Sequence, residues 1–206
     1  DFNIESATEL VVDDKYILNT KTTIHGLEDC RLLQNSNLNF AFSTNRQYTN
    51  STSNKISVVS WSGINQPHNE KSPEVRVNLK KTNLPENITE DQCQKNWLPF
   101  CDKAKAYFVF SINPFVVCNM KSVKICEYKS KYFEFDGLKG STAPIPFRSA
   151  NKTEYFIMIV HYCQYNISGR RYYNRFLTLD DKFHPVRLSG GFKLSDKNIE
   201  YISGMR

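Results

Sequence analysis

The stretch Ile24–Leu33 reads Ile-His-Gly-Leu-Glu-Asp-Cys-Arg-Leu-Leu and sets an acidic pair, Glu28 and Asp29, close before Arg31. The apolar residues around these charges predict a strand. Because strand side chains alternate between two faces, we expect Asp29 and Arg31 to point the same way and Glu28 the opposite way. A carboxylate beside a guanidinium is typical of sugar-processing sites and equally of a structural ion pair, so the rest of the sequence has to decide between them.

The composition is that of an ordinary globular protein that is rich in aromatic residues. Of the 206 residues, 40% are hydrophobic and 23% charged, which is enough for one good core, and we expect a single domain over 1–206. The aromatic share of 13% favours strands and surfaces that stack flat ligands. The net charge of +6 is scattered, so no nucleic-acid partner is expected. No apolar run approaches the roughly 20 residues of a membrane-spanning helix.

Short runs of β-branched and aromatic residues, separated by turn residues, predict an all-β fold. Many short strands at this spacing are typical of a sandwich, a barrel or a propeller. A propeller is favoured because aromatic strands recur at Phe40, Tyr107 and Tyr155, which start 67 and 48 residues apart. The expected strands are Leu38–Ser43, Lys55–Trp61, Glu74–Leu79, Ala106–Ile112, Ser122–Tyr128, Tyr155–His161, Tyr172–Leu179, Pro185–Leu188 and Ile199–Ile202.

Cysteines and glycosylation sequons favour the secretory pathway lumen or the extracellular space. The chain has six cysteines, and six allow 15 disulfide pairings among which the sequence does not choose. No Cys-x-x-Cys motif indicates zinc. Spacing makes Cys93–Cys101 and Cys118–Cys126 the local disulfide candidates. Four sequons lie in polar, turn-like stretches that could carry a glycan, at Asn50, Asn87, Asn151 and Asn166.

Six segments, taken in order, resemble the five-bladed β-propellers of glycoside hydrolase family 130 and their relatives, the mannoside phosphorylases and propeller-type mannosyltransferases. Gly26–Arg31 is similar to the family's Gly-x-Glu-Asp-Pro-Arg signature. The other five segments resemble the Glu-Lys-Asn-Trp-x-Pro-Phe element, the Tyr-x-Tyr-Ser-x-x-Pro strand and turn, the Arg-Gly-x-x-Pro loop, the Tyr-His strand end and the Phe-x-x-Gly-Leu element. They are Gln94–Phe100, Tyr107–Pro114, Gly137–Pro144, Ile159–His161 and Ile199–Met205.

The resemblance implies a central funnel that binds a mannose-type sugar, with Asp29 as general acid and with no metal or cofactor. A general acid needs a partly dry pocket to hold its proton near neutral pH. A close Arg31 would lower the pKa of this carboxyl, so Arg31 is expected to pair with Glu28 or to orient a substrate hydroxyl. The other implied substrate-binding residues are His161, Lys139 and Lys95 near a phosphate or nucleophile, and Asn96, Trp97 and Asn113 around the sugar, with Trp97 as a stacking platform.

Each of these residues also has a structural interpretation. Trp97 suits the core or the packing between blades, His161 suits a satisfied structural histidine, Lys95 and Lys139 suit the surface, and Asn113 starts a turn before proline.

Departures from the family pattern define a second hypothesis. Cys30 stands where the family has proline, Lys139 where it has arginine and Gln94 where it has glutamate. A secreted glycoprotein that keeps the propeller for sugar binding or structural assembly, without catalysis, would tolerate these replacements. The chain is expected to cover about three to four blades and to be incomplete at both ends. A longer protein or other protein chains would then complete the ring, since open blades leave unpaired edges.

Overall fold

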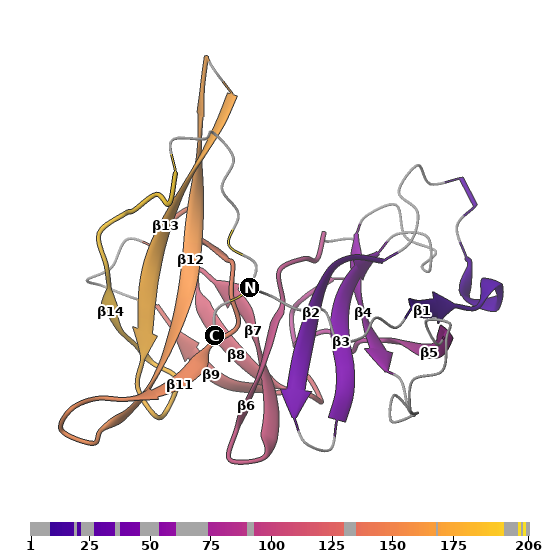
Figure 1. Cartoon of the computed structure of the whole chain (residues 1–206), viewed down its shortest axis with the longest axis horizontal. Helices are drawn as coiled ribbons and strands as arrows, with labels where there is room; N and C mark the ends of the chain where they lie inside the picture. The colour runs from indigo at the N-terminus through magenta and orange to yellow at the C-terminus, as the bar shows by residue number, and fades with distance from the viewer. Residues whose placement is uncertain are drawn as a thin grey trace, which may run out of the picture. The chain divides into compact units, whose positions relative to one another are not determined.

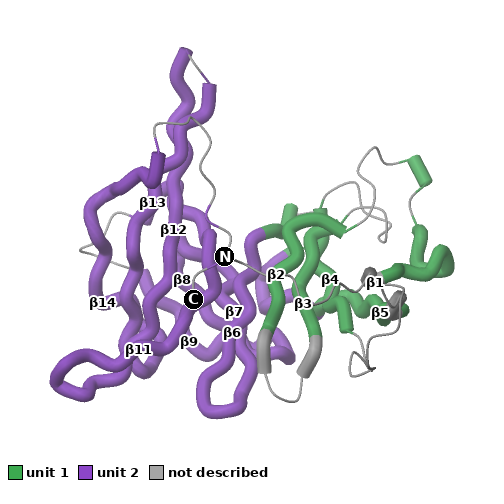
Figure 2. Tube along the Cα trace, in the orientation of Figure 1, with its two compact units in different colours: residues 1–82, 89–95 green, residues 83–88, 96–206 purple. Residues whose placement is uncertain are grey.

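The computed structural model describes residues 9–18, 20–21, 27–35, 38–45, 54–60, 74–89, 93–129, 135–167, 169–195, 202 and 204. The regular elements of this part are strands apart from one short 3-10 helix, and the architecture includes a curled sheet, so the all-β prediction is confirmed. The chain forms two compact units (Figure 2). The first comprises Asp1–Thr82 and Thr89–Lys95, and the second comprises Asn83–Ile88 and Asn96–Arg206. Blades of one propeller would also be separate compact units, so the single domain over 1–206 stays a prediction.

The first unit is built on a five-stranded sheet in the order β1-β5-β4-β3-β2 (Figure 1). Strands β2 to β5 form an antiparallel meander, and β1 pairs in parallel with β5. The interior strand β3 is buried on both faces from Phe40 to Asn45, which explains its run of small and aromatic residues. The elements are β1 (Glu9–Val12), η1 (Asp14–Tyr16), β2 (Leu27–Asn35), β3 (Leu38–Asn45), β4 (Lys55–Ser60) and β5 (Glu74–Lys81).

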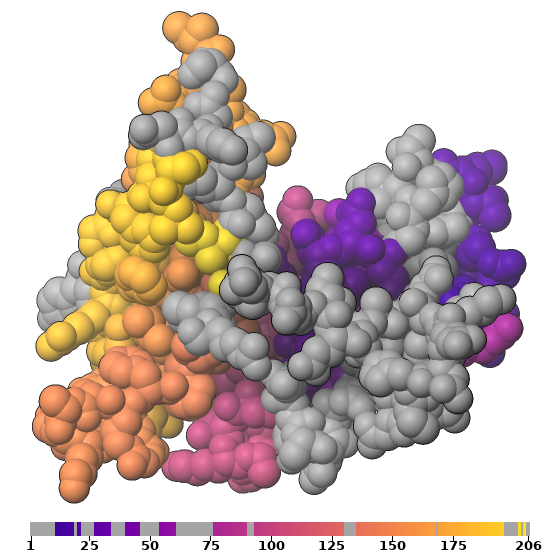
Figure 3. Space-filling view, viewed as in Figure 1, coloured from indigo at the N-terminus to yellow at the C-terminus, as the bar shows by residue number. Residues whose placement is uncertain are grey.

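The second unit contains two antiparallel sheets. One is the meander β6-β7-β8-β9, and the other has the order β10-β12-β13-β14, with β11 also pairing with β12. The hairpin of β12 and β13 is long and extends beyond the rest of its sheet (Figure 1 and Figure 3). The strands are β6 (Leu98–Asp102), β7 (Lys105–Ile112), β8 (Phe115–Asn119), β9 (Lys124–Tyr128), β10 (Lys139–Gly140), β11 (Ile145–Arg148), β12 (Glu154–Asn166), β13 (Gly169–Leu179) and β14 (Pro185–Leu188).

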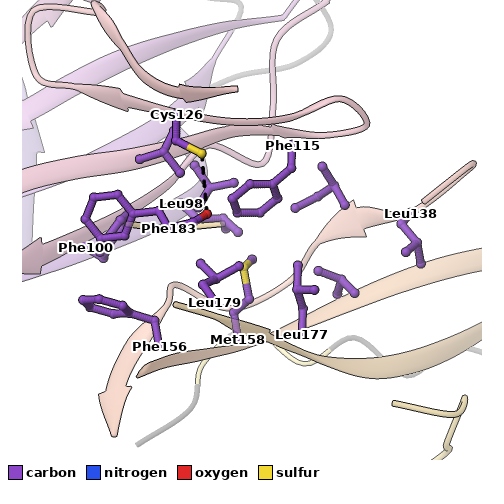
Figure 4. Close-up of a cluster of buried hydrophobic side chains, with 14 of the residues drawn as sticks. Leu98, Phe100, Phe115, Cys126, Leu138, Phe156, Met158, Leu177, Leu179 and Phe183 are labelled. Carbon is purple, nitrogen blue, oxygen red and sulfur yellow. Dashed lines mark hydrogen bonds between the residues drawn. The ribbon is translucent and has the colours of Figure 1, made fainter. Parts of the chain in front are cut away.

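An apolar core joins the two sheets of the second unit (Figure 4). Alternate residues of each sheet supply it, including Leu98 and Phe115 from one sheet and Met158 and Leu177 from the other. Phe183, in the turn after β13, inserts its ring between the two sheets. That ring lies 5.3 Å from the Phe100 and Phe156 rings and 5.2 Å from the Tyr107 ring, between centroids. Phe183 has a left-handed φ of 67°, a costly conformation that the burial of its ring offsets.

The expected strands agree with the structure over most of the described chain, although β12 and β13 are longer than expected. The prediction Ile199–Ile202 lies almost entirely outside the described residues. The strands β1, β6, β8, β10 and β11 were not expected. In β6 and β11 a proline interrupts the apolar run, and β8 directly follows the Asn113-Pro114 turn, so the sequence there suggests a turn rather than a strand.

The predicted Cys118–Cys126 disulfide is wrong. Both thiols are free, and the strand register explains why. Cys126 lies opposite Val117 and points into the core, where its Sγ contacts the Phe183 carbonyl oxygen at 3.7 Å. Cys118 lies on the other face of β8, opposite Phe108 on β7. A bridge needs Cβ atoms that face each other, which residues on opposite faces of a sheet do not provide.

The second predicted bridge would join Cys93 of the first unit to Cys101 of the second, and it stays a prediction; Cys93 is exposed. Burial raises the pKa of the Cys118 and Cys126 thiols to about 11, so neither thiol is a ready nucleophile at neutral pH.

Candidate functional site

A β-bulge in β2 sets the geometry of the acidic motif. Glu28 pairs with Thr44 and Arg31 with Phe42, so three steps along β2 match two steps along β3. Residues opposite each other share a face, and Thr44 and Phe42 share one, so Glu28 and Arg31 lie on the same face. The expectation that Glu28 points away from Arg31 is therefore wrong. The alternation rule fails because the bulge inserts one extra residue.

Asp29 is part of this bulge and has a left-handed φ of 48°, which is unusual for a residue other than glycine. Its side chain is exposed, as are those of Glu28 and Cys30, whereas Arg31 is buried. The hydroxyl of Ser43 donates a hydrogen bond of 3.0 Å to the Glu28 carbonyl oxygen and so anchors the strand beside the bulge. The first unit therefore holds Asp29 in a strained, solvent-accessible conformation and, among its described residues, does not surround it with a dry pocket.

A second polar centre lies in the second unit, at β10 and β12. Lys139 pairs directly with His161 across these strands, and the next residue, Gly140, pairs with Val160. The Ser141 hydroxyl oxygen lies 2.6 Å from Nδ1 of His161, and both residues are buried. The backbone N–H of Ile159 donates to the Thr142 hydroxyl at 2.8 Å. These contacts bring the Gly137–Pro144 segment and the Ile159–His161 segment together.

Asn174 on β13 completes this centre from the other side of β12. It lies opposite His161 in the strand register, and its side chain is fully buried. Neither its amide oxygen nor its amide nitrogen has a hydrogen-bond partner in the part of the chain that the structure describes. An unsatisfied buried amide costs about 1–3 kcal/mol, which makes Asn174 a candidate for contact with a bound polar group.

The sequence did not single out Ser141 and Asn174 as site residues. Ser141 lies inside the Gly137–Pro144 segment, and a search for hydroxyls next to the expected His161 could have found it. Asn174 lies in a Tyr-Tyr-Asn run, and only the pairing of β12 with β13 reveals that it faces His161.

Trp97, the predicted stacking platform, is 2% exposed. Its ring stacks on Phe108 at 4.8 Å and meets Phe110 edge-on at 5.2 Å. One face of the indole is therefore already occupied, and the structure favours packing over sugar stacking for this residue.

The remaining predicted binding residues have varied environments. Lys95 is exposed and belongs to the first unit. Asn96 belongs to the second unit, is partly buried and has a left-handed φ of 61°. Asn113 is exposed in the β7–β8 turn, before a cis proline. None of these three contacts the His161 centre through a described side-chain hydrogen bond, so their roles stay predictions.

Three of the predicted glycosylation residues are accessible. Asn87, Asn151 and Asn166 are exposed, the first two in turns and the third at the end of β12. Asn50 lies outside the described residues. The accessible positions meet the steric requirement for a glycan.

Among the described residues, no cluster of three or more histidine, cysteine, aspartate or glutamate side chains could hold a metal ion. The described part of the chain has no helix of the length and apolar character needed to cross a membrane. No protein-family model matches the chain, and no curated protein is significantly similar to it.

Proposed function

We propose that the protein is carbohydrate-active and transfers or cleaves a mannose-type glycosidic bond, with Asp29 as the general acid. The observation that carries this proposal is the bulge in β2, which holds Asp29 in a left-handed conformation. Bulges next to active sites re-aim a side chain, and a strained non-glycine residue persists only where its surroundings impose the strain. A plain structural ion pair on a strand would need neither feature.

The His161 centre supports the proposal by offering groups suited to sugar hydroxyls. The Ser141–His161 pair can both donate and accept hydrogen bonds, and the Asn174 amide provides two donors and one acceptor. Lys139 lies opposite His161 and adds a cation to this centre. Sugar sites need closely spaced donors and acceptors of this kind because each hydroxyl does both.

The strand order supports a family-130-like propeller of the five-bladed type. The described residues form three successive antiparallel meanders: β2 to β5, β6 to β9, and β12 to β14 with β10 or β11. Propeller blades are four-stranded meanders, and neighbouring blades pack face to face. The sheets of the second unit share one apolar core in this manner. The described part would then represent three of the blades of a secreted or lumenal protein that acts on glycans.

The test is a screen of sugar-phosphate and nucleotide-sugar donors with the wild type and the Asp29→Asn variant. Loss of a general acid lowers the rate by about 10²–10⁴-fold, and we expect that loss with Asp29→Asn. The exposed Asp14 on η1 gives a matched control, because Asp14→Asn removes the same charge from the same unit. Equal activity of Asp29→Asn and the wild type would overturn the assignment of Asp29.

The exposure of the acidic motif favours a second function, sugar binding or structural assembly without catalysis. Glu28, Asp29 and Cys30 are all exposed, whereas a general acid requires partial desolvation. In this case the wild type would bind mannose-containing glycans and turn over none of the donors. Binding would be unchanged in Asp29→Asn and reduced in Asn174→Ala.

A further inference from the structure

The β12–β13 hairpin carries a row of arginine and tyrosine side chains where its sheet extends past the core. Arg171, Tyr173 and Arg175 alternate along β13 and so share one face. This is the face that supplies Leu177 and Leu179 to the apolar core further along the same strand. The face therefore changes from apolar to basic as the hairpin leaves the core. We call Tyr162, Arg171, Tyr173 and Arg175 the basic hairpin face.

The side chains of this face are preorganised by ring contacts. Tyr162 lies opposite Tyr173 and the two rings stack, with centroids 5.0 Å apart and an interplanar angle of 12°. The guanidinium of Arg175 lies over the Tyr162 ring, 5.4 Å from its centroid. A guanidinium held on a ring loses less freedom when it binds an anion than one that moves freely in solvent.

The two arginines are not neutralised within the described chain. The Nε atoms of Arg171 and Arg175 are buried and have no hydrogen-bond partner there. No carboxylate forms a described ion pair with either residue. Next to Arg175 the chain has Gly191, where a Cβ would stand 3.5 Å from the Tyr162 hydroxyl oxygen and 4.0 Å from the Arg175 Nε. At this position there is no side chain to cover the guanidinium.

The distance between Arg171 and Arg175 along β13 indicates which kind of anion fits the face. Residues four apart on a strand are separated by about 13 Å along the backbone, so one small anion does not fill the face. A linear polymer with anionic groups at intervals matches a row of cations along a strand. The guanidinium group of arginine binds tetrahedral oxyanions such as sulfate through two parallel N–H donors. Exposed sequons on the same chain favour a partner of the secretory pathway or the cell exterior over a nucleic acid.

We propose that the basic hairpin face binds a sulfated polysaccharide along β13, with Arg171 and Arg175 each holding a sulfate group. The inference concerns a separate surface and goes beyond the proposed glycosidic chemistry. Binding at this face would keep the protein on an extracellular or cell-surface glycan while the proposed site acts elsewhere on the chain.

The experiment measures binding of size-defined heparin oligosaccharides, used as the sulfated probe, to the whole chain produced without N-glycans. The variant R171Q/R175Q is compared with R148Q/R187Q, which removes the same charge from two exposed arginines of the same unit. We expect about tenfold weaker binding for each arginine lost from the hairpin face, and little change in the control. A second variant, R171K/R175K, keeps the charge and the fold but removes the bidentate geometry. Its affinity for heparin should lie between those of the wild type and R171Q/R175Q.

Several outcomes would overturn the proposal. Equal weakening in the two glutamine variants would show that only net charge matters. Absence of heparin binding would show that the face does not bind sulfated polysaccharides. Tighter binding of a phosphomannan or of single-stranded DNA than of heparin would assign the face to another partner. An Asp29→Asn variant that binds heparin normally supports the separation of this surface from catalysis, and loss of binding in that variant would contradict it.

Discussion

Replacement of Gly140 by alanine tests the packing that holds the His161 centre. A Cβ at Gly140 would overlap the Leu98 side chain, closest to its Cδ1 and 3.2 Å from its Cγ, and would stand 3.6 Å from the Asn96 carbonyl oxygen. Leu98 is completely buried, so its side chain has no solvent into which it could turn. The overpacked core should destabilise the protein by about 1–3 kcal/mol. Because Gly140 is next to Ser141, the strain should also lengthen the Ser141–His161 contact.

The assay is urea unfolding of G140A, L98A and the double variant. Leu98→Ala alone should cost about 2–5 kcal/mol through the cavity that it leaves. In the double variant the new methyl group enters part of that cavity. We therefore expect a total loss smaller than the sum of the single losses by about 1 kcal/mol or more, as residues in contact couple. Additive losses, or a G140A protein as stable as the wild type, would refute the close approach of β10 to Leu98.

The remaining predictions concern buried thiols, glycosylation, the bulge and the core. The pKa of the Cys118 and Cys126 thiols is raised to about 11 by burial, so their contribution to stability is complete below about pH 9 and is lost as pH rises toward 11. The free energy of unfolding in urea should be lower at pH 10.5 than at pH 8 by up to about 2 kcal/mol per thiol, and a variant with both cysteines replaced by alanine should show a much smaller loss. Secretory expression of Asn151→Gln should remove the mass of one glycan on a denaturing gel, and an unchanged mass would mean that this sequon is unused. Asp29→Gly should raise the free energy of unfolding by up to about 1 kcal/mol, and with it the urea midpoint, because glycine tolerates the left-handed conformation; a lower midpoint would contradict the strained bulge. Phe183→Ala should lower the free energy of unfolding by about 3–5 kcal/mol in the same assay, and a loss below about 1 kcal/mol would contradict the central position of this ring.

Local sequence patterns were sufficient for the fold class and for most strands. Runs of β-branched and aromatic residues predict a strand such as β7 well, because side chains of this kind pack well on a pleated, partly buried surface. The pattern was less informative for β8, where four successive residues from Phe115 to Cys118 are buried on both faces and directly follow a turn proline. A continuous apolar run of this kind does not reveal which residues face which sheet.

Side-chain directions at the sites depend on register, which a single strand does not contain. The alternation rule misplaced Glu28 relative to Arg31 because the extra residue is visible only when β2 is paired with β3. The same limit explains the wrong Cys118–Cys126 bridge, since the two cysteines belong to one hairpin but to opposite faces. The pairing of Lys139 with His161 did not follow from the sequence pattern. The family resemblance only implied that both residues belong to one substrate site. Asn174 became visible only through the pairing of β13 with β12.

The parallel pairing of β1 with β5 has a consequence for the order of folding during synthesis. Glu9 pairs with Glu74, so β1 leaves the ribosome 65 residues before its partner strand begins. The meander from β2 to β5 can form through hairpins between neighbouring strands, whereas β1 must wait for a contact of long sequence separation. The strand that is made first is therefore attached last. Until then the β5 edge is open to pairing with other chains, a period during which a chaperone or a fast closing step would protect the nascent sheet.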